Sequence, residues 1–479
     1  MSNTQLRLDR TQNVPIYRQL YQRLREAMAD GRLPPGKRVP SVRSLASELN
    51  LSRGTVELAY QLLVSEGYFL PRGPAGTIVS PHLPESTKPA ATPETATGQE
   101  PKPGLAPPLP FQLGLPALDA FPNKLWTRLT HRRLRAQTSA ELNYPPPTGH
   151  PALKRALVTY LGVSRGIACQ PEQIFITDSY RDSLGLICRA LLKSGDSGWF
   201  EEPGYLMARE RLLNEGMHLT PVGVDAEGLN VEEGLNVEEG LNVEDESRAT
   251  SARFAVVTPT HQSPTGVTMT LARRQALLAW ASRENAWIIE DDYDSEYRYH
   301  GHPVPALKSL DHDDRVLYAG TFSKVLFPAI KLAYLVVPLS QVAIFQQAMQ
   351  RLGHGCPTLS QAVVTDFIEE GHFARHLKRM RALYKVRREH LRQALEHHLG
   401  DRIRIDLQAG GMHLLVRLAD DIDDVAIASR AASAGLGGHA LSAWTLTPTR
   451  QSGMLLSFTN VIDADHAHAL AARLATLLE

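Results

Sequence analysis

A lysine and a group of carboxylates are the residues of this sequence best suited to carbonyl chemistry. Lys324 follows an apolar run at residues 316–319 and stands close to a glycine, a threonine and a serine. A lysine amine attacks an aldehyde only when it is deprotonated, and a partly desolvated pocket lowers its pKa toward neutrality. The spacing alone leaves two interpretations open, a catalytic amine or a solvated surface lysine.

An apolar stretch upstream ends in a cluster of acids and a tyrosine. Residues 287–289 are Trp-Ile-Ile, and Asp291 and Tyr293 follow them. In open α/β sheets ligands bind at the carboxyl ends of strands, so this stretch and the lysine segment can deliver polar side chains to one crevice. Such a carboxylate can pair with a pyridinium nitrogen, and such a tyrosine can bond a phenolate oxygen. A divalent-metal site and a solvated acidic loop are the alternatives.

The two segments together resemble the cofactor-binding strands of fold-type I aminotransferases, which hold pyridoxal 5′-phosphate (PLP). The resemblance implies an α/β fold, with a mixed, mainly parallel sheet in a large domain and a smaller C-terminal α/β domain. It also implies that Lys324 forms the covalent link to PLP, that Asp291 pairs with the pyridine nitrogen, and that Tyr293 bonds the 3′ oxygen of the ring.

Further segments fit the same resemblance. A strand-to-helix turn at residues 174–187 offers free backbone N–H groups to a phosphate, and the resemblance assigns Ser179, Tyr180 and Arg181 there. Asp178 stands in this turn in place of the usual glycine. Tyr205 takes the place of the aromatic that stacks on the pyridine ring, and Thr321 contributes a hydroxyl.

Three further positions depart from the aminotransferase pattern. Ser263 replaces an asparagine that bonds the 3′ oxygen, and Lys331 replaces an arginine that grips the phosphate. Lysine supplies the charge without the bidentate fork. Leu455 stands where working aminotransferases carry the arginine for the substrate carboxylate. An α-amino acid would lose this anchor, so the effector is PLP itself, an amino compound, or a ligand held by another residue such as Arg450.

The charge of the chain is unevenly distributed. Residues 1–80 hold 11 Lys and Arg against 6 Asp and Glu, a net charge of +5, and the other 399 residues hold 40 against 45, a net charge of −5. A basic end on an acidic body indicates a nucleic-acid partner.

The basic segment has the pattern of a helix-turn-helix. Apolar residues recur every fourth position from Ile16 to Met28, and two short helices are expected at residues 41–49 and 51–63, the second capped by Ser52. A polar hairpin follows at residues 68–79. The segment resembles the winged helix-turn-helix of GntR-type bacterial regulators, down to the Pro-Pro-Gly-X-Arg-X-Pro-Ser-X-Arg pattern at residues 34–43. A small protein-binding helical domain is the alternative.

The GntR resemblance implies contacts with double-stranded DNA. The residues that it assigns to these contacts are Arg38, Ser41, Arg43, Ser52, Arg53, Thr55 and, in the wing, Gly76 and Thr77. The sequence leaves open whether the arginines contact bases or phosphates.

The chain is expected to comprise a DNA-binding domain at 1–80, a flexible linker rich in Pro, Thr and Ala at 81–110, and an aminotransferase-like domain at 111–479, with the small-domain part at about 345–479. Three copies of a six-residue repeat at residues 228–245 predict a surface loop without chemistry. Tyr144 resembles the aminotransferase tyrosine that crosses a dimer interface to the partner's phosphate. The alternative is a packing tyrosine in a Pro-rich loop.

Other features of the sequence indicate the cellular location and whether a metal is bound. Three scattered cysteines and the lack of an apolar leader or membrane-length segment predict a cytoplasmic protein. His372 and His376 stand four apart, but nothing nearby completes a ligand set, so no metal site is predicted.

The chain as a whole resembles the MocR-type regulators, which fuse a GntR-type DNA reader to an aminotransferase-like domain. His261 and Gln262, and the basic helix at residues 370–388, fit this branch. The expected function is a homodimeric, PLP-binding regulator of transcription that binds an operator and senses PLP or an amine effector through Lys324. Two rivals are an active aminotransferase with a DNA-binding domain and a DNA-binding protein whose second domain has lost the cofactor. Whether transaminase activity remains is left open.

Overall fold

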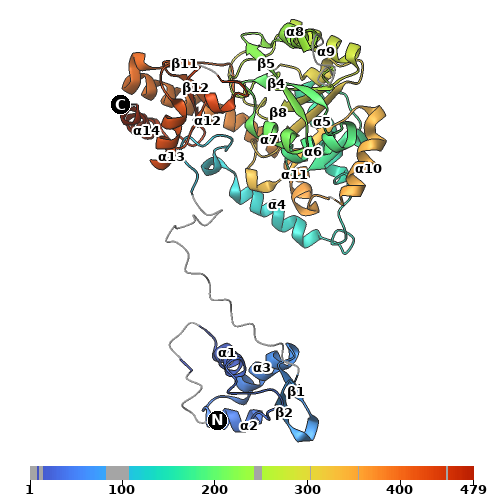
Figure 1. The fold of residues 1–479 in the computed structure, drawn as a ribbon, viewed down its shortest axis with the longest axis vertical. Helices are drawn as coiled ribbons and strands as arrows, with labels where there is room; N and C mark the ends of the chain where they lie inside the picture. The colour runs from blue at the N-terminus through green and yellow to red at the C-terminus, as the bar shows by residue number, and fades with distance from the viewer. Residues whose placement is uncertain are drawn as a thin grey trace. The chain divides into compact units, whose positions relative to one another are not determined.

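The computed structural model describes residues 8–9, 14–81, 107–241, 251–302, 304–353, 355–448 and 451–478 (Figure 1). The chain divides into two compact units, residues 1–105 and 106–479. Most of the predicted linker, residues 82–106, lies outside the described residues. None of the described helices has a stretch long and apolar enough to cross a bilayer.

The N-terminal unit contains the predicted helices and hairpin. Its elements are α1 (Ile16–Ala29), α2 (Val42–Glu48), α3 (Arg53–Ser65), β1 (Phe69–Pro71) and β2 (Thr77–Val79), and β1 pairs antiparallel with β2. The side chains of Ser41 and Ser52 accept backbone N–H groups at the starts of α2 and α3, which confirms the predicted cap at Ser52. Fully buried side chains from α1, α3 and β1 form one core: Leu20, Val56, Leu63 and Phe69.

The second unit is built on a mixed, mainly parallel sheet, as predicted. Its strand order is β3-β10-β9-β8-β7-β4-β5-β6. All neighbours are parallel except the pairs of β10 with β3 and β9, and of β6 with β5. The strands are β3 (Ile174–Thr177), β4 (Ser197–Glu202), β5 (His218–Asp225), β6 (Gly228–Leu229), β7 (Phe254–Val257), β8 (Trp287–Asp292), β9 (Val316–Thr321) and β10 (Ala333–Val336).

Helices cover both faces of this sheet, so alternate residues of its strands enter different cores. Phe175, Leu317 and Leu335 pack with α6, α7 and α10, whereas Ile176 and Tyr318 pack with α5, α11 and α12. The helices of this part are α4 (Asn123–Ala136), α5 (Pro151–Arg165), α6 (Tyr180–Leu191), α7 (Leu206–Asn214), α8 (Val231–Leu241), α9 (Leu271–Glu284), α10 (Val342–Leu352) and α11 (Thr358–Glu369).

A smaller antiparallel sheet lies to one side of the large one, in the orange and red part of Figure 1. Its order is β11-β12-β14-β13. The elements are α12 (His372–Leu399), β11 (Arg404–Asp406), β12 (His413–Arg417), α13 (Asp424–Ser433), β13 (His439–Ala440), β14 (Gly453–Ser457) and α14 (Ala464–Leu477). Short 3₁₀ turns occur at Gly73–Ala75, Leu118–Ala120, Pro171–Gln173, Leu307–Leu310, Pro328–Ile330, Leu339–Gln341, Gly400–Arg402 and Ser442–Trp444.

The six-residue repeat is not the surface loop that its periodicity predicted. Its first copies form strand β6 and helix α8, and Leu229 and Val231 are buried. Gly234 lies so close to the Trp199 ring that a Cβ would collide with it, and Trp199 stacks on Trp280 at 4.0 Å. Apolar residues within the copies meet an aromatic core, so the repeat forms regular structure. Residues 242–250 lie outside the described residues.

Strand β8 contains three consecutive buried acids. Because successive side chains of a strand point to opposite faces of the sheet, the middle acid has different neighbours from the other two. Glu290 accepts the backbone N–H groups of Leu307 and Lys308, both at 2.8 Å. Asp292 points to the same face, where Arg165 Nη2 lies 2.7 Å from its Oδ2 and Tyr318 donates to it at 2.6 Å. Asp291 points to the other face, toward the carboxyl end of the sheet.

Replacing Asp292 with asparagine is expected to lower the free energy of unfolding by about 3–5 kcal/mol, because the Arg165 guanidinium would stay buried without a counter-charge. Denaturant unfolding followed by tryptophan fluorescence measures the loss. The control Glu396→Gln breaks an exposed ion pair with Arg392 and is expected to change stability by less than about 1 kcal/mol. Equal effects of the two substitutions would contradict the prediction.

Candidate functional site

A cavity of about 330 Å³ lies at the carboxyl ends of β8 and β9 and reaches the small sheet. Residues of the large domain and of the small domain both line it. The segment that enters the second unit contributes Leu113 and Gly114. From the large domain come Ser179, Tyr180, Arg181, Tyr205, Leu206, Met207, Ser263, Asp291, Tyr293, Thr321, Ser323 and Lys324, and from the small domain Met412, His413, His439 and Trp444.

The Lys324 amine is held by the chain segment that enters the second unit. Its Nζ donates to the carbonyl oxygen of Gly114 at 3.0 Å. Gly114 has a φ of +75°, and a Cβ at this position would collide with Nζ. Burial lowers the pKa of Lys324, while Asp291 and Asp294 act in the opposite direction. More of the amine is therefore in the neutral, nucleophilic form than in an exposed lysine at the same pH.

Asp291 presents a buried carboxyl group to the same cavity. Its pKa is raised well above the usual value by burial and then by the adjacent charge of Asp292, and Lys324 opposes this shift. The Tyr180 hydroxyl lies near the Asp291 carboxylate but makes no hydrogen bond of standard geometry with any described residue. A ligand that brings a cationic N–H donor would stabilise the ionised form of Asp291.

The Tyr293 hydroxyl is positioned by a histidine. His261 Nδ1 lies 2.9 Å from Tyr293 Oη and 3.1 Å from Asp294 Oδ2. The His261 ring fits between Gly266 and Gly411, whose φ values are +76° and +95°, and a Cβ on either glycine would crowd the ring. Since neither glycine could be replaced without moving the imidazole, the packing fixes where the Tyr293 oxygen lies.

The loop that carries His261 and Ser263 is anchored by a buried glutamate. Glu201 accepts the N–H and hydroxyl of Thr258 at 3.0 and 2.6 Å and the Gln262 amide at 3.0 Å. Burial raises the pKa of Glu201 to about 7 despite these donors. Ser263 N–H in turn donates to the Thr258 hydroxyl at 3.0 Å, which places Ser263 at the cavity wall.

A helix N-terminus and an arginine form the opposite end of the cavity. Ser179 caps α6 by accepting the N–H of Asp182, and its hydroxyl lies 2.7 Å from the Asp182 carboxylate. The Arg181 side chain is exposed, with Nη1 3.8 Å from the Met207 sulfur. Free N–H groups at the start of α6 and the guanidinium together favour an anionic group of a ligand.

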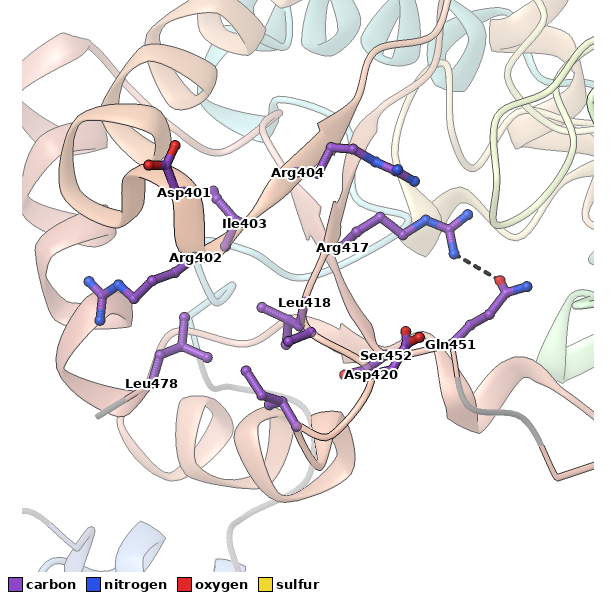
Figure 2. A pocket seen from close by; sticks show the side chains of 12 residues that line it. Asp401, Arg402, Ile403, Arg404, Arg417, Leu418, Asp420, Gln451, Ser452 and Leu478 are labelled. Carbon is purple, nitrogen blue, oxygen red and sulfur yellow. Dashed lines mark hydrogen bonds between the residues drawn. The ribbon is translucent and has the colours of Figure 1, made fainter.

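A second hollow, of about 680 Å³, lies in the small domain and contains none of the predicted site residues (Figure 2). Arginines and aspartates line it, and its charges are partly paired. Arg417 lies 2.8 Å from both Asp406 and the Gln451 side chain, and Arg404 lies 3.4 Å from Asp406. The cavity around Lys324 is therefore the better candidate for chemistry.

The N-terminal unit presents a separate polar surface. Arg43 and Arg53 are exposed at the starts of α2 and α3. Arg38 is also exposed, and its backbone forms a β-bridge with Ile78. Its guanidinium packs against Gly76, so that a Cβ on Gly76 would lie 2.8 Å from the Arg38 Nε. The arginine is thus joined to the wing, next to Thr77.

Comparison with known proteins gives the family. The model of the gntR family of bacterial regulatory proteins matches residues 16–79, and that of class I and II aminotransferases matches residues 118–435. The probable rhizopine catabolism regulatory protein MocR of Rhizobium meliloti is 37% identical over 470 residues, which cover 95% of this chain and 92% of that protein. The chain belongs to the MocR-type transcriptional regulators.

Two further similar proteins, a regulator and an aminotransferase, represent the two kinds of protein that this MocR-type regulator resembles. The pyridoxine biosynthesis transcriptional regulator PdxR of Corynebacterium glutamicum is 31% identical over 92% of this chain and 91% of its own length. Pyrococcus horikoshii kynurenine aminotransferase, whose crystal structure is known, is 30% identical in sequence to this chain. The match covers 77% of this chain and 90% of the aminotransferase chain, with a TM-score of 0.69. The winged helix-turn-helix shared with the regulators distinguishes the chain from a free-standing aminotransferase.

The structure brings most of the residues predicted for the cofactor into the Lys324 cavity, but it leaves several elsewhere. Tyr144 is 96% exposed in the loop before α5, and Lys331 is exposed after the turn at Pro328–Ile330. Leu455 is 0% exposed on β14 and packs with Trp444. Arg450 lies outside the described residues. The nine that line the cavity are Ser179, Tyr180, Arg181, Tyr205, Ser263, Asp291, Tyr293, Thr321 and Lys324.

Sequence reasoning missed the residues that position these groups. His261 was noticed only as a family marker, and its adjacency to the Pro-Thr-Gly turn was the available signal. Gly114 follows the Pro-rich segment without any motif. His413 bonds the Pro264 carbonyl at 2.9 Å through Nε2, and its chain neighbour Met412 also lines the cavity.

Gly411→Ala is expected to destabilise the regulator more than Gly435→Ala does. Both glycines have a left-handed backbone, with φ of +95° and +72°, so both variants carry about 1–2 kcal/mol of backbone strain. Only Gly411→Ala must also displace the His261 ring, whereas a Cβ at Gly435 would meet nothing within 4 Å. Thermal unfolding compares the two. A midpoint for Gly411→Ala at or above that of Gly435→Ala would show that His261 is not held by this contact.

Proposed function

We propose that this MocR-type regulator binds PLP in the Lys324 cavity and acts in the cytoplasm as a PLP-dependent switch of transcription. One observation carries the proposal: a buried lysine with a lowered pKa and a buried carboxyl group face the same cavity. The homologous kynurenine aminotransferase was solved in complex with PMP, the amine form of this cofactor.

The cavity residues match the chemical groups of PLP. Lys324 would hold the aldehyde carbon, and Asp291 would accept the hydrogen bond of the pyridine nitrogen. Tyr293, with Ser263 beside it, would bond the ring's 3′ oxygen. When bound, PLP supplies an aldehyde that reacts reversibly with amines.

Five further residues fit the remaining parts of the cofactor. The helix end at Ser179, together with Arg181, would face the phosphate, and Tyr205 would lie against the ring. Thr321 adds a hydroxyl at the same wall, and Tyr180 would complete the donor set beside Asp291. Lys331 lies on the surface, so a role for it in phosphate binding would require a different side-chain position.

The effector is an amine or PLP itself. Leu455 is fully buried in an apolar cluster, so it offers no charge to an α-carboxylate. The ligand would therefore be selected through its amine, by exchange at Lys324, and through the small-domain side chains His439 and Trp444. Because the cavity is lined by both domains, a ligand with different affinity for their open and closed arrangements would shift that equilibrium.

The DNA reader is the winged helix-turn-helix, working in a homodimer on a double-stranded operator. The exposed Arg43 and Arg53 at the helix starts, and Arg38 on the wing, supply the positive charge that phosphates attract. Tyr144 and Leu142 are 96% and 73% exposed, and a partner subunit would cover this surface. Tyr144 would then reach the partner's phosphate site.

A second candidate is an active aminotransferase that also binds DNA. The intact set of Lys324, Asp291 and Tyr293 favours it, since these three residues match the cofactor-binding positions of aminotransferases. The buried Leu455 disfavours it, because the substrate carboxylate would lack its arginine. Turnover of an amino donor with a keto acceptor distinguishes the two functions.

Purified protein with added PLP is expected to develop a visible absorption band, and Lys324→Ala is expected to abolish it. Lys193→Ala, which removes an exposed lysine of the same domain, should retain the band. Since burial lowers the pKa of Lys324, the band should persist to lower pH than the adduct of PLP with a free lysine. A band of equal intensity in Lys324→Ala would place the attachment at another lysine, and no band in either protein would remove the PLP-sensing mechanism.

Arg53→Ala and Arg43→Ala are expected to weaken DNA binding and to reduce its dependence on salt. If each contacts one phosphate, the slope of log affinity against log salt falls by about 1 per variant; a base contact would instead relax specificity at one position. Fluorescence anisotropy with a duplex selected by the wild-type protein measures both. Arg23→Ala, which removes an α1 arginine paired with Glu26, is the control, and an equal loss in this variant would contradict the assignment.

A further inference from the structure

Three histidines meet on the surface of the small domain, away from the Lys324 cavity. His397 and His398 belong to the last turn of α12, and His468 lies in the second turn of α14. These two helices pack against each other. His397 and His468 are exposed, and His398 is half-buried between them.

The distances between the three rings suit a shared ligand. His468 Nδ1 lies 3.3 Å from His398 Nε2, and one nitrogen of each ring lies within 4.8 Å of one nitrogen of each of the others. A tetrahedral ion with Zn–N bonds of 2.0–2.1 Å separates its ligand nitrogens by about 3.3 Å. The closest pair is already at this spacing, and the exposed His397 ring can rotate to close the remaining gap.

The three rings offer the ligand type that a zinc-class cation requires. Each contributes one ring nitrogen to the same small volume, and an imidazole nitrogen presents its lone pair to a metal. A single hydrogen bond between His398 and His468 would account for that pair but not for the third ring, whose centroid lies 4.9 and 5.4 Å from theirs.

We propose that His397, His398 and His468 form a binding site for a divalent cation of the zinc class, with solvent in the fourth position. Imidazole ligands suit Zn²⁺, Ni²⁺ and Cu²⁺ and do not suit Mg²⁺ or Ca²⁺. The bound ion would join the end of α12 to α14. The site is independent of the PLP cavity, so it holds whether or not the proposed function is correct.

One neighbouring charge limits the affinity. Arg402 donates to the carbonyl oxygen of His398 at 3.0 Å, so its positive charge lies near the site; Figure 2 labels this residue at the edge of the second hollow. With three ligands and this repulsion, the site should bind more weakly than closed four-ligand zinc sites.

Isothermal titration of the untagged, PLP-treated protein with Zn²⁺ tests the proposal, and Co²⁺ absorption reports the geometry. One equivalent of Zn²⁺ should bind, Co²⁺ should give the intense visible bands of a tetrahedral site, and Mg²⁺ should give no heat. His398→Gln and His468→Gln should each weaken Zn²⁺ binding at least about tenfold, since each removes one of three ligands.

His466→Gln is the matched control, because His466 lies on the same helix but accepts the N–H of Ile462 through Nδ1 at 3.2 Å. This variant should bind Zn²⁺ as the wild type does. Circular dichroism without metal verifies that each variant is folded. Unchanged Zn²⁺ affinity in the His398→Gln/His468→Gln double variant, or a Co²⁺ spectrum of octahedral type in the wild type, would overturn the proposal.

Discussion

The burial of three consecutive carboxyl groups in β8 is the constraint on which the rest of the second unit depends. Glu290, Asp291 and Asp292 are 0%, 6% and 7% exposed, in the middle of an eight-stranded sheet. A buried carboxyl group is costly unless it is paired, bonded or protonated. The structure gives Glu290 two backbone donors and gives Asp292 the guanidinium of Arg165. Among the residues that the structure describes, no backbone donor or guanidinium comparably pairs with Asp291, and burial raises its pKa.

The alternation of side chains along β8 places Asp291 on the face of the sheet that carries the candidate site. Asp291 is opposite Ala319 on the parallel neighbour β9, and Lys324 follows β9 in the next turn. The carboxyl and the amine therefore emerge at the same end of the sheet, on the face that Asp292 does not use. The ion pair behind the strand fixes its orientation. The site thus holds a buried acid and a desolvated amine, and a ligand with a cationic N–H donor would stabilise the ionised form of the acid.

The sequence allowed the fold and nine of the eighteen cavity residues to be predicted because those signals lie in short, local motifs. Helix caps such as Ser52 lie within four residues of the groups that they bond, and strands such as β8 begin with a continuous apolar run. Long-range partners leave no such trace. Nothing near Arg165 indicates that it neutralises Asp292, and nothing near Gly114 indicates that its carbonyl accepts from Lys324.

Two other outcomes have the same physical origin. The periodicity of the repeat predicts a surface loop. Its apolar positions contradict this prediction because they meet a tryptophan pair, and that contact exists only in the folded sheet. The histidine cluster combines residues about 70 positions apart, so a search for ligands along one helix does not find it. In each case the decisive neighbour is distant in sequence.

The buried Leu455 fits the proposal that this aminotransferase fold serves a regulator. The resemblance to aminotransferases expects a charged anchor for the substrate carboxylate at this position of β14, and catalysis gains from every substrate group that an enzyme binds. Here Leu415, Leu441, Trp444 and Leu455 form an apolar cluster against which Tyr205 of the large domain packs. Both Trp444 and Tyr205 also line the Lys324 cavity. A ligand that occupies the cavity therefore contacts the surface on which the two domains meet. Under the proposed function, such contacts would shift the relative positions of the domains without requiring that the ligand be turned over, and this shift would be the signal to the DNA-binding unit.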